Sequence, residues 1–426
     1  MTSQLSKTLK PSQVPTIKTF RQYIVIWIGQ ILSLLGSSIV QFTMIWWITT
    51  ETQSSMYLSF AAFLGFLPQI ILSPFMGVLA DKFDRQKIII YSDLLQAAVT
   101  TIIIAGLMFN FMNYTLFFII LALRSVFQTV QSPSKAAIVS SMVPKDRLSR
   151  LNGIDYLLSS IVAIAGPAFA ALLLKFFTFY QILFVDLITF VFALIPLLFL
   201  SIPKLESQPK SKQKKGIRDY FSKIKAGFDL LSSNRPFMIL LFTASILNLF
   251  IMPFNTLLPY YVNVTNQGTE DELAILMGAL KVGLLLGSLI STLKKEWKNK
   301  TRLTYFLLTL QFIGYLILSF SPSGMYPLMS SGLFIAGLTF PILNSTIITS
   351  MQQKIPQEYQ GRIFSILISI SGLISPLGII LSGTLENLVG VKLLWILSAS
   401  IAFLFVQCIW LFTKVSKALD GDFKLP

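Results

Sequence analysis

The chain has 426 residues, of which 54% are hydrophobic and only 12% charged, and its formal net charge is +16. Soluble proteins carry a charge on about a quarter of their residues, so this composition excludes a soluble globular fold. Surplus basic residues indicate nucleic-acid binding in a soluble domain, but here they lie between apolar runs, and we expect no nucleic-acid partner. Histidine is absent and the one cysteine, Cys408, lies inside an apolar run. An intrachain disulfide and a Cys- or His-based metal site are thereby excluded, and we expect no cofactor.

Apolar runs of about 18 residues or more recur along the chain, and each is long enough to cross a bilayer as a helix. The sequence therefore predicts an all-α polytopic membrane protein with twelve transmembrane helices in two pseudo-symmetric six-helix halves. The polar N-terminus does not fit a cleaved signal peptide, so we expect the first span to direct insertion. The predicted spans are residues 22–49, 56–80, 86–109, 113–142, 151–175, 178–200, 236–262, 271–293, 302–321, 325–351, 360–387 and 390–414.

The longest polar connection, residues 201–235, divides the predicted spans into an N-terminal half (22–200) and a C-terminal half (236–414). Of the 34 Lys and Arg residues, 29 fall in this linker, in the tails (1–21 and 415–426), in the other loops on the same side or at the span ends that border them. Because Lys- and Arg-rich loops stay in the cytoplasm, the linker and both tails are predicted to be cytoplasmic.

The two halves also resemble each other in sequence. Residues 132–150 align with residues 344–362 at an offset of 212, with Pro144 on Pro356 and Arg150 on Arg362. Both segments occupy the same turn of their half, between the fourth and fifth spans. Six plus six helices with an internal repeat are typical of transporters that work by rocking one half against the other.

The stretch "GVLADKFDRQK" forms the predicted turn between spans 2 and 3, and it resembles the signature loop of the major facilitator superfamily. The resemblance implies a cytoplasmic gate, in which the acid accepts bonds from a helix N-terminus and an arginine. Asp84 stands where the family pattern has glycine. The equivalent turn of the second half has Ser291 in place of the acid, so we expect a one-sided gate. The gate residues are Gly77, Asp81, Lys82, Arg85 and Lys87.

Further stretches match a branch of this superfamily. Arg124 in "LALRSVFQTVQSPS" matches the membrane-embedded arginine of the superfamily, and Gly166 and Pro167 in "AGPAFAA" resemble a reduced glycine-proline motif of helix packing. With "WIGQILSLLGSSIVQFTMIWWITTETQSS", "PFNTLLPYYV" and "GRIFSIL", the chain resembles the macrolide-efflux branch of drug:proton antiporters over nearly its whole length. This resemblance implies a monomer that exports a lipophilic compound in exchange for protons across a bacterial-type plasma membrane.

Several charges fall inside the predicted spans, where each costs about 2.5–3.5 kcal/mol on insertion scales. Arg124 and Asp186 lie at similar depths, so they can pair. Asp186 is then either a proton-titrating site or half of a permanent ion pair, and the sequence leaves both open. For Asp93 and Asp155, predicted near the cytoplasmic interface, structural bonding is favoured over proton coupling. Lys281, near the middle of span 8, attracts an anionic substrate, neutralises an acid of the other half, or reaches the interface.

In this superfamily the substrate cavity is lined by spans 1, 4, 7 and 10. Amide and aromatic side chains there suit a bulky amphipathic ligand, although Trp46 and Trp47 are equally explained as interface anchors. The cavity residues we predict, together with Lys281, are Gln30, Gln41, Gln128, Asn248, Asn255 and Asn344.

No catalytic constellation or nucleotide-binding motif occurs in the sequence, so we expect neither an enzyme nor an ATP-driven pump. The predicted function is proton-coupled export, by alternating access, of a lipophilic drug-like compound such as a macrolide. Two alternatives stay open. One is an exporter of an endogenous anionic or amphipathic metabolite, siderophore-like or lipid-like, and the other is a non-transporting membrane sensor.

Overall fold

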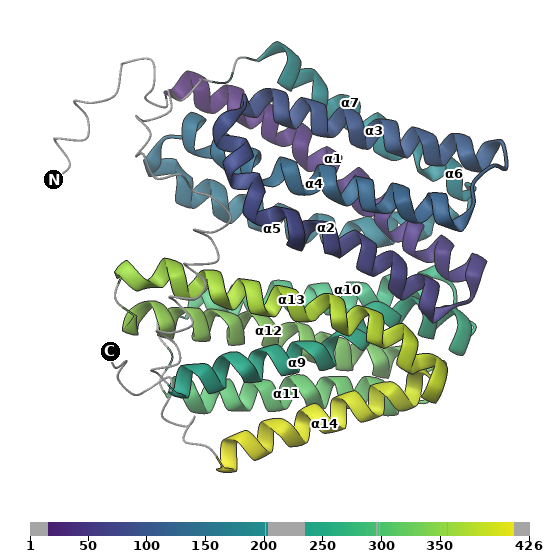
Figure 1. Cartoon of the computed structure of the whole chain (residues 1–426), viewed down its shortest axis with the longest axis vertical. Coiled ribbons are helices and arrows are strands. Elements are labelled where there is room, and N and C mark those ends of the chain that lie inside the picture. The colour runs from purple at the N-terminus through teal and green to yellow at the C-terminus, as the bar shows by residue number, and fades with distance from the viewer. Residues whose placement is uncertain are drawn as a thin grey trace. The chain divides into compact units, whose positions relative to one another are not determined.

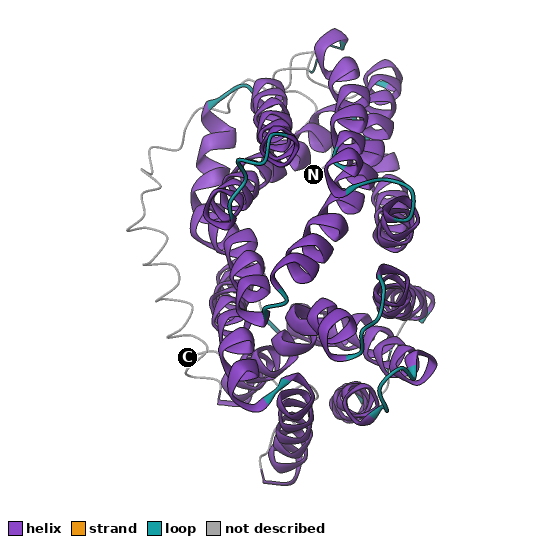
Figure 2. Ribbon diagram, turned by 90° about the vertical axis from the view of Figure 1, so that its right-hand side faces the viewer, coloured by secondary structure: helices purple, strands orange, loops and turns teal. Residues whose placement is uncertain are grey.

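The computed structural model describes residues 16–200, 202, 235–294, 297, 299–355 and 357–412, and every regular element among them is helical (Figures 1 and 2). Twelve stretches are long and apolar enough to cross a membrane, which confirms the predicted number of spans. Short α6 and α7 together make the sixth of them, Phe179–Phe199. The helices are α1 (Ile17–Thr52), α2 (Ser55–Lys82), α3 (Arg85–Met108), α4 (Tyr114–Met142), α5 (Lys145–Leu174), α6 (Phe179–Ile182), α7 (Phe184–Phe199), α9 (Arg235–Tyr260), the π-helical η3 (Tyr261–Thr265), α10 (Glu270–Leu293), α11 (Lys300–Phe320), α12 (Tyr326–Lys354), α13 (Gln357–Val389) and α14 (Val391–Phe412).

Two of the tight turns between spans have local causes. α3 begins after Asp84, whose side chain accepts a hydrogen bond from the backbone N–H of Gln86 at 3.1 Å. A carboxylate in this position satisfies one of the free N–H groups at a helix start. α13 ends at Val389, and the next residue, Gly390, has a φ of +78° in the left-handed region that glycine adopts without strain. These two residues separate helices that would otherwise run together.

The internal repeat is visible in the helix bounds. α4 and α12 are both 29 residues long, and their first residues, Tyr114 and Tyr326, lie 212 positions apart. α5 and α13 begin at Lys145 and Gln357, which are separated by the same interval. The structure therefore confirms the offset of 212 that the sequence predicted.

The described residues form two compact units. The first comprises residues 16–44 and 64–202, and the second comprises residues 45–63 and 235–412. The last turns of α1 and the first turns of α2 thus group with the second unit, where the Ser55 hydroxyl donates a hydrogen bond to the Gly383 carbonyl at 3.3 Å. Of the predicted linker, residues 201–235, only Ile202 and Arg235 are among the described residues, so its role as a boundary stays a prediction.

In the first unit, α1 lies against α7 through two small residues two helical turns apart. A Cβ atom on Gly29 would come within 2.7 Å of the Phe192 carbonyl oxygen, and one on Gly36 would overlap the Thr189 side chain. Close approach through glycine is a common way to pack membrane helices, because lipid offers no hydrophobic drive to association. This contact brings the following residue of α1, Ser37, to the polar side chains of α7.

The second unit is held by similar glycine contacts and by stacked aromatic rings. Gly283 and Gly287 of α10 lie against the backbone of α12. The Phe254 ring stacks on Tyr315 with ring centroids 4.4 Å apart, and the buried Trp395 donates a hydrogen bond to the Pro253 carbonyl at 3.0 Å. These contacts form an apolar and aromatic core.

Candidate functional site

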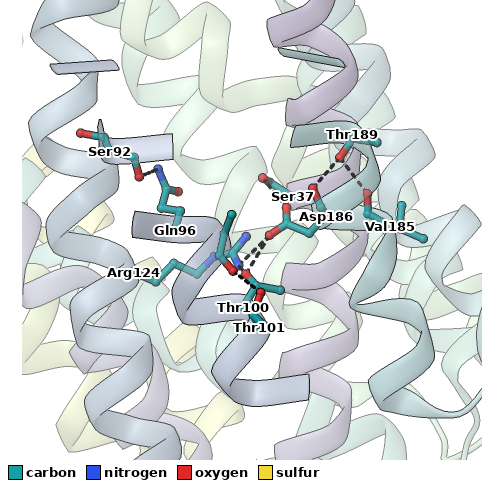
Figure 3. Close-up of polar contacts among 10 residues, drawn as sticks. Ser37, Ser92, Gln96, Thr100, Thr101, Arg124, Val185, Asp186 and Thr189 are labelled. Carbon is teal, nitrogen blue, oxygen red and sulfur yellow. Dashed lines mark hydrogen bonds and ion pairs between the residues drawn. The ribbon is translucent and has the colours of Figure 1, made fainter. Parts of the chain in front are cut away.

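A buried ion pair lies inside the first unit, and four helices contribute to it (Figure 3). Arg124 Nη1 of α4 lies 2.8 Å from Asp186 Oδ2 of α7. The Thr100 hydroxyl of α3 donates to the same carboxylate oxygen at 3.0 Å and accepts a bond from Arg124 at 2.6 Å. The Ser37 hydroxyl of α1 donates to Asp186 Oδ1 at 3.0 Å. We call Ser37, Thr100, Arg124 and Asp186 the ion-pair layer.

The ion-pair layer is internally satisfied. Both oxygens of the Asp186 carboxylate accept hydrogen bonds, one of them also meets the guanidinium group, and only 7% of the residue is exposed. Opposite charges that neutralise each other and share further hydrogen bonds can persist in a membrane. The arrangement joins α1, α3, α4 and α7 at one level of the unit.

A second polar cluster surrounds Asp93 of α3, of which 6% is exposed. Gln131 Nε2 of α4 donates to Asp93 Oδ1 at 2.5 Å. Asp93 Oδ2 and Gln30 Nε2 are buried and make no hydrogen bond of ordinary geometry with a described residue, although the Gln30 amide acts on the Asp93 carboxylate. We call Gln30, Asp93 and Gln131 the amide layer.

Asp155 lies deeper in its helix than the sequence suggested. The prediction started span 5 at residue 151, but α5 begins at Lys145, because its first turns are polar and escape a hydropathy count. Asp155 is therefore about 15 Å from the start of the helix, at 1.5 Å per residue. Its carboxylate accepts a hydrogen bond from Trp27 Nε1 of α1 at 2.6 Å.

The predicted gate is only partly within the described side chains. The side chains of Asp81 and Lys82, and the surroundings of Gly77, lie outside them. Arg85 is half-buried and Lys87 is exposed.

A contact in this turn that the sequence did not suggest comes from Gln86. Its side-chain amide donates to the carbonyls of Leu197 at 2.5 Å and Leu200 at 3.0 Å, and so joins the start of α3 to the end of α7.

Lys281 lies at the middle of α10 and is half-buried. It makes no hydrogen bond or ion pair with any residue that the structure describes. With about 100° of rotation per residue, it points away from the Gly283 face that contacts α12. A lysine in this position keeps its charge available to a partner outside its own helix pair.

The remaining predicted residues are placed as follows. Gly166 lies close to Ser38 of α1, and Pro167 is inside α5. Trp46 is buried and Trp47 half-buried. Of the predicted cavity amides, Gln30 and Asn248 are half-buried, whereas the exposed ones are Gln41, Gln128, Asn255 and Asn344. That these amides line one cavity stays a prediction.

A separate hollow of about 390 Å³ lies between α1 and α7, beside Arg21, Val25 and Phe199. It contains none of the predicted cavity residues.

Comparison with known proteins gives consistent results. Residues 26–379 match the Major Facilitator Superfamily. The chain is 31% identical over 387 residues to macrolide efflux protein A of Streptococcus pyogenes, which covers 89% of this chain and 93% of that protein. It is also 31% identical over 333 residues to macrolide efflux protein A of Enterococcus faecalis, and this alignment covers 76% of this chain and 99% of that protein. The solved nucleoside transporter NupG has a similar fold, with a TM-score of 0.70 at 12% identity over 90% of this chain and 98% of that one.

Proposed function

Because the chain belongs to the major facilitator superfamily, we propose that it exports a lipophilic, drug-like compound such as a macrolide in exchange for protons. It is a multi-pass membrane transporter and not an enzyme, as the sequence predicted. In the proposed cycle a central cavity opens alternately to the two sides of a bacterial plasma membrane, with both chain termini in the cytoplasm.

The macrolide part of the proposal is supported by the two relatives at 31% identity, which are named for macrolide efflux and align over most of this chain. The many apolar and amide side chains on the membrane helices suit a large amphipathic compound. A substrate of this kind reaches the protein from the lipid or the cytoplasm and needs few charged contacts.

Ion coupling is supported by one observation above all, which is that the Arg124–Asp186 ion pair has no counterpart in the other copy of the repeat. At the 212-residue offset, Arg124 of α4 corresponds to Ala336 of α12, a buried residue in an otherwise equivalent helix. The fold is therefore built in the second unit without this charge. Charged residues kept inside a membrane at a cost mark ion or substrate pathways.

The energy that proton entry supplies is sufficient to drive export of a substrate against its concentration gradient. One elementary charge that crosses 100 mV gains about 2.3 kcal/mol, which sustains about a 40-fold concentration ratio of an uncharged substrate. Closely packed helix pairs such as α10 and α12 are suited to move together as rigid bodies during such a cycle.

The test is macrolide efflux from cells that express the chain, with and without an uncoupler, against cells that lack it. We expect net efflux that the uncoupler abolishes. Efflux that continues unchanged with uncoupler would contradict proton coupling. If no macrolide moves, the assignment of this substrate is wrong, and if no compound of a broad panel moves, a sensor is favoured over a transporter.

A second candidate, the export of an anionic amphipathic metabolite, is favoured by Lys281. A cation at the middle of a span, without a partner in the described structure, attracts an anion and repels a cationic drug. The same efflux assay with matched neutral, cationic and anionic compounds separates the two candidates. Transport confined to the anionic compounds would replace the macrolide proposal.

A further inference from the structure

The amide layer and the ion-pair layer are related by a constant spacing along three helices. Gln30 precedes Ser37 on α1, and Asp93 precedes Thr100 on α3, each by seven residues. On α4, which runs the opposite way in sequence between the same two ends of the unit, Gln131 follows Arg124 by seven. Seven residues are about two helical turns or about 10.5 Å. The first unit thus contains two polar levels on the same helix faces.

The two levels differ in how their carboxylates are satisfied. In the ion-pair layer, Asp186 has a guanidinium partner and hydrogen bonds on both oxygens. In the amide layer, Asp93 has one bond from Gln131, and its second oxygen is buried without a hydrogen bond of ordinary geometry, although the Gln30 amide acts on the carboxylate. No cation is bonded to it among the described residues. A charged oxygen left in this state is costly inside a protein, and binding of a proton removes the charge.

The nearest cation to the amide layer is Lys135, one helical turn beyond Gln131 on α4. Its charge acts on two carboxylates, Asp93 of α3 and Asp155 of α5. It forms no ion pair with either of them, nor with any other residue in the described ranges. Asp155 has its own hydrogen bond from Trp27. The lysine therefore interacts electrostatically with two carboxylates without forming an ion pair with either of them.

The other helices around Asp93 bring no further close charge among the described side chains. α1 contributes the uncharged Gln30, and the Asp186 carboxylate of α7 acts on Asp93 from the neighbouring layer, where Arg124 neutralises it. At the repeat offset, Gln131 and Lys135 correspond to Leu343 and Ile347 of α12. The helix therefore packs without these polar groups, which points to a role other than folding.

We propose that Asp93 is the group that takes up and releases the transported proton, with Lys135 as its movable counter-charge, while Arg124 and Asp186 stay paired throughout the cycle. This inference rests on the proposed proton-coupled export. On uptake, an oxygen of the Asp93 carboxylate gains one proton, and the freed Lys135 ammonium is drawn to Asp155. On release, the O–H bond of Asp93 breaks, the proton leaves to the other side, and Lys135 returns towards Asp93.

A first experiment tests proton binding without any substrate. Difference infrared spectra of the purified full chain in liposomes are recorded on a change of pH, and the carboxylic-acid band is followed. We expect the Asp93→Asn variant to lose the band and the Asp186→Asn variant to keep it. Asp186→Asn is the matched control, because it makes the same replacement in the other layer. A band lost in Asp186→Asn and kept in Asp93→Asn would overturn the proposal.

A second experiment separates coupling from substrate movement. For one proton per substrate, a gradient of one pH unit supports about tenfold accumulation of a macrolide. In Asp93→Asn we expect no accumulation, with exchange of labelled for unlabelled macrolide at equal pH retained. Retained accumulation would refute the role of Asp93, and loss of exchange with unaltered infrared spectra would show a structural role instead. If the wild-type protein moves no macrolide, the proposed function fails, whereas the infrared result still decides whether Asp93 binds a proton.

Discussion

Removal of one partner of the Arg124–Asp186 pair is the most direct test of the ion-pair layer. The Asp186→Leu variant leaves the Arg124 guanidinium with only the Thr100 hydroxyl as a hydrogen-bond partner among the described residues. Breaking a buried pair in this way costs about 3–5 kcal/mol of unfolding free energy. The Arg124→Met variant is expected to cost about the same, because it leaves a buried carboxylate unpaired.

The double variant, with both replacements, should recover most of this loss, since apolar side chains of similar volume often replace a buried pair at little cost. The second unit supports this expectation, because α12 has the buried Ala336 in the position of Arg124. The interaction free energy of the double-mutant cycle is therefore expected to be several kcal/mol in size.

Thermal unfolding in detergent micelles measures these differences. With about 2–4 °C for each kcal/mol in a unit of this size, each single variant should unfold about 6–20 °C below the wild-type chain, and the double variant within a few degrees of it. Additive losses, or single variants that unfold within about 2 °C of the wild type, would refute the view that the two charges neutralise each other.

Three further predictions concern other parts of the chain. Gly36→Val should destabilise the protein by more than about 1–3 kcal/mol, the usual cost of overpacking, because its side chain would overlap Thr189. Gly65→Ala is the control, because a Cβ atom at Gly65 meets nothing within 4 Å. Equal stability of the two variants would contradict the α1–α7 contact. Asp84→Ala should lower the free energy of unfolding by about 1 kcal/mol through loss of the α3 cap, whereas Asp84→Asn should not. Thermal unfolding again measures both variants, and equal unfolding temperatures would argue against capping. Lys281→Met should raise stability by up to about 3 kcal/mol, the insertion cost of the charge, and abolish any transport of anions; unchanged anion transport would remove Lys281 from the substrate path.

The fold was predictable because the membrane imposes simple requirements on a sequence. Twelve apolar runs are read directly from hydropathy, and the repeat offset of 212 was visible in Pro144 and Pro356 before the helix bounds showed it. The bounds themselves were less predictable, as at α5, whose first turns contain several charges. A hydropathy count reports the part of a helix within the lipid, and not the part that extends beyond it.

The candidate site was predictable only in part. The depths of Arg124 and Asp186 suggested that they can pair, and the structure has them in contact, but their role in transport stays a prediction. Ser37 and Thr100 were missed because hydroxyl residues carry little hydropathy signal and often bond to their own helix. Their seven-residue spacing from Gln30 and Asp93 was present in the sequence, and this regularity was the signal that could have identified them.

The spacing also limits how the first unit can move. α1, α3 and α4 each carry one member of both layers, two turns apart on a rigid rod of backbone hydrogen bonds. A helix that rotates to break its contact at one level must turn its side chain at the other level by the same angle. Movements at the two layers are therefore coupled. A change of protonation at Asp93 either leaves the orientation of all three helices unchanged or disturbs the Arg124–Asp186 ion pair as well.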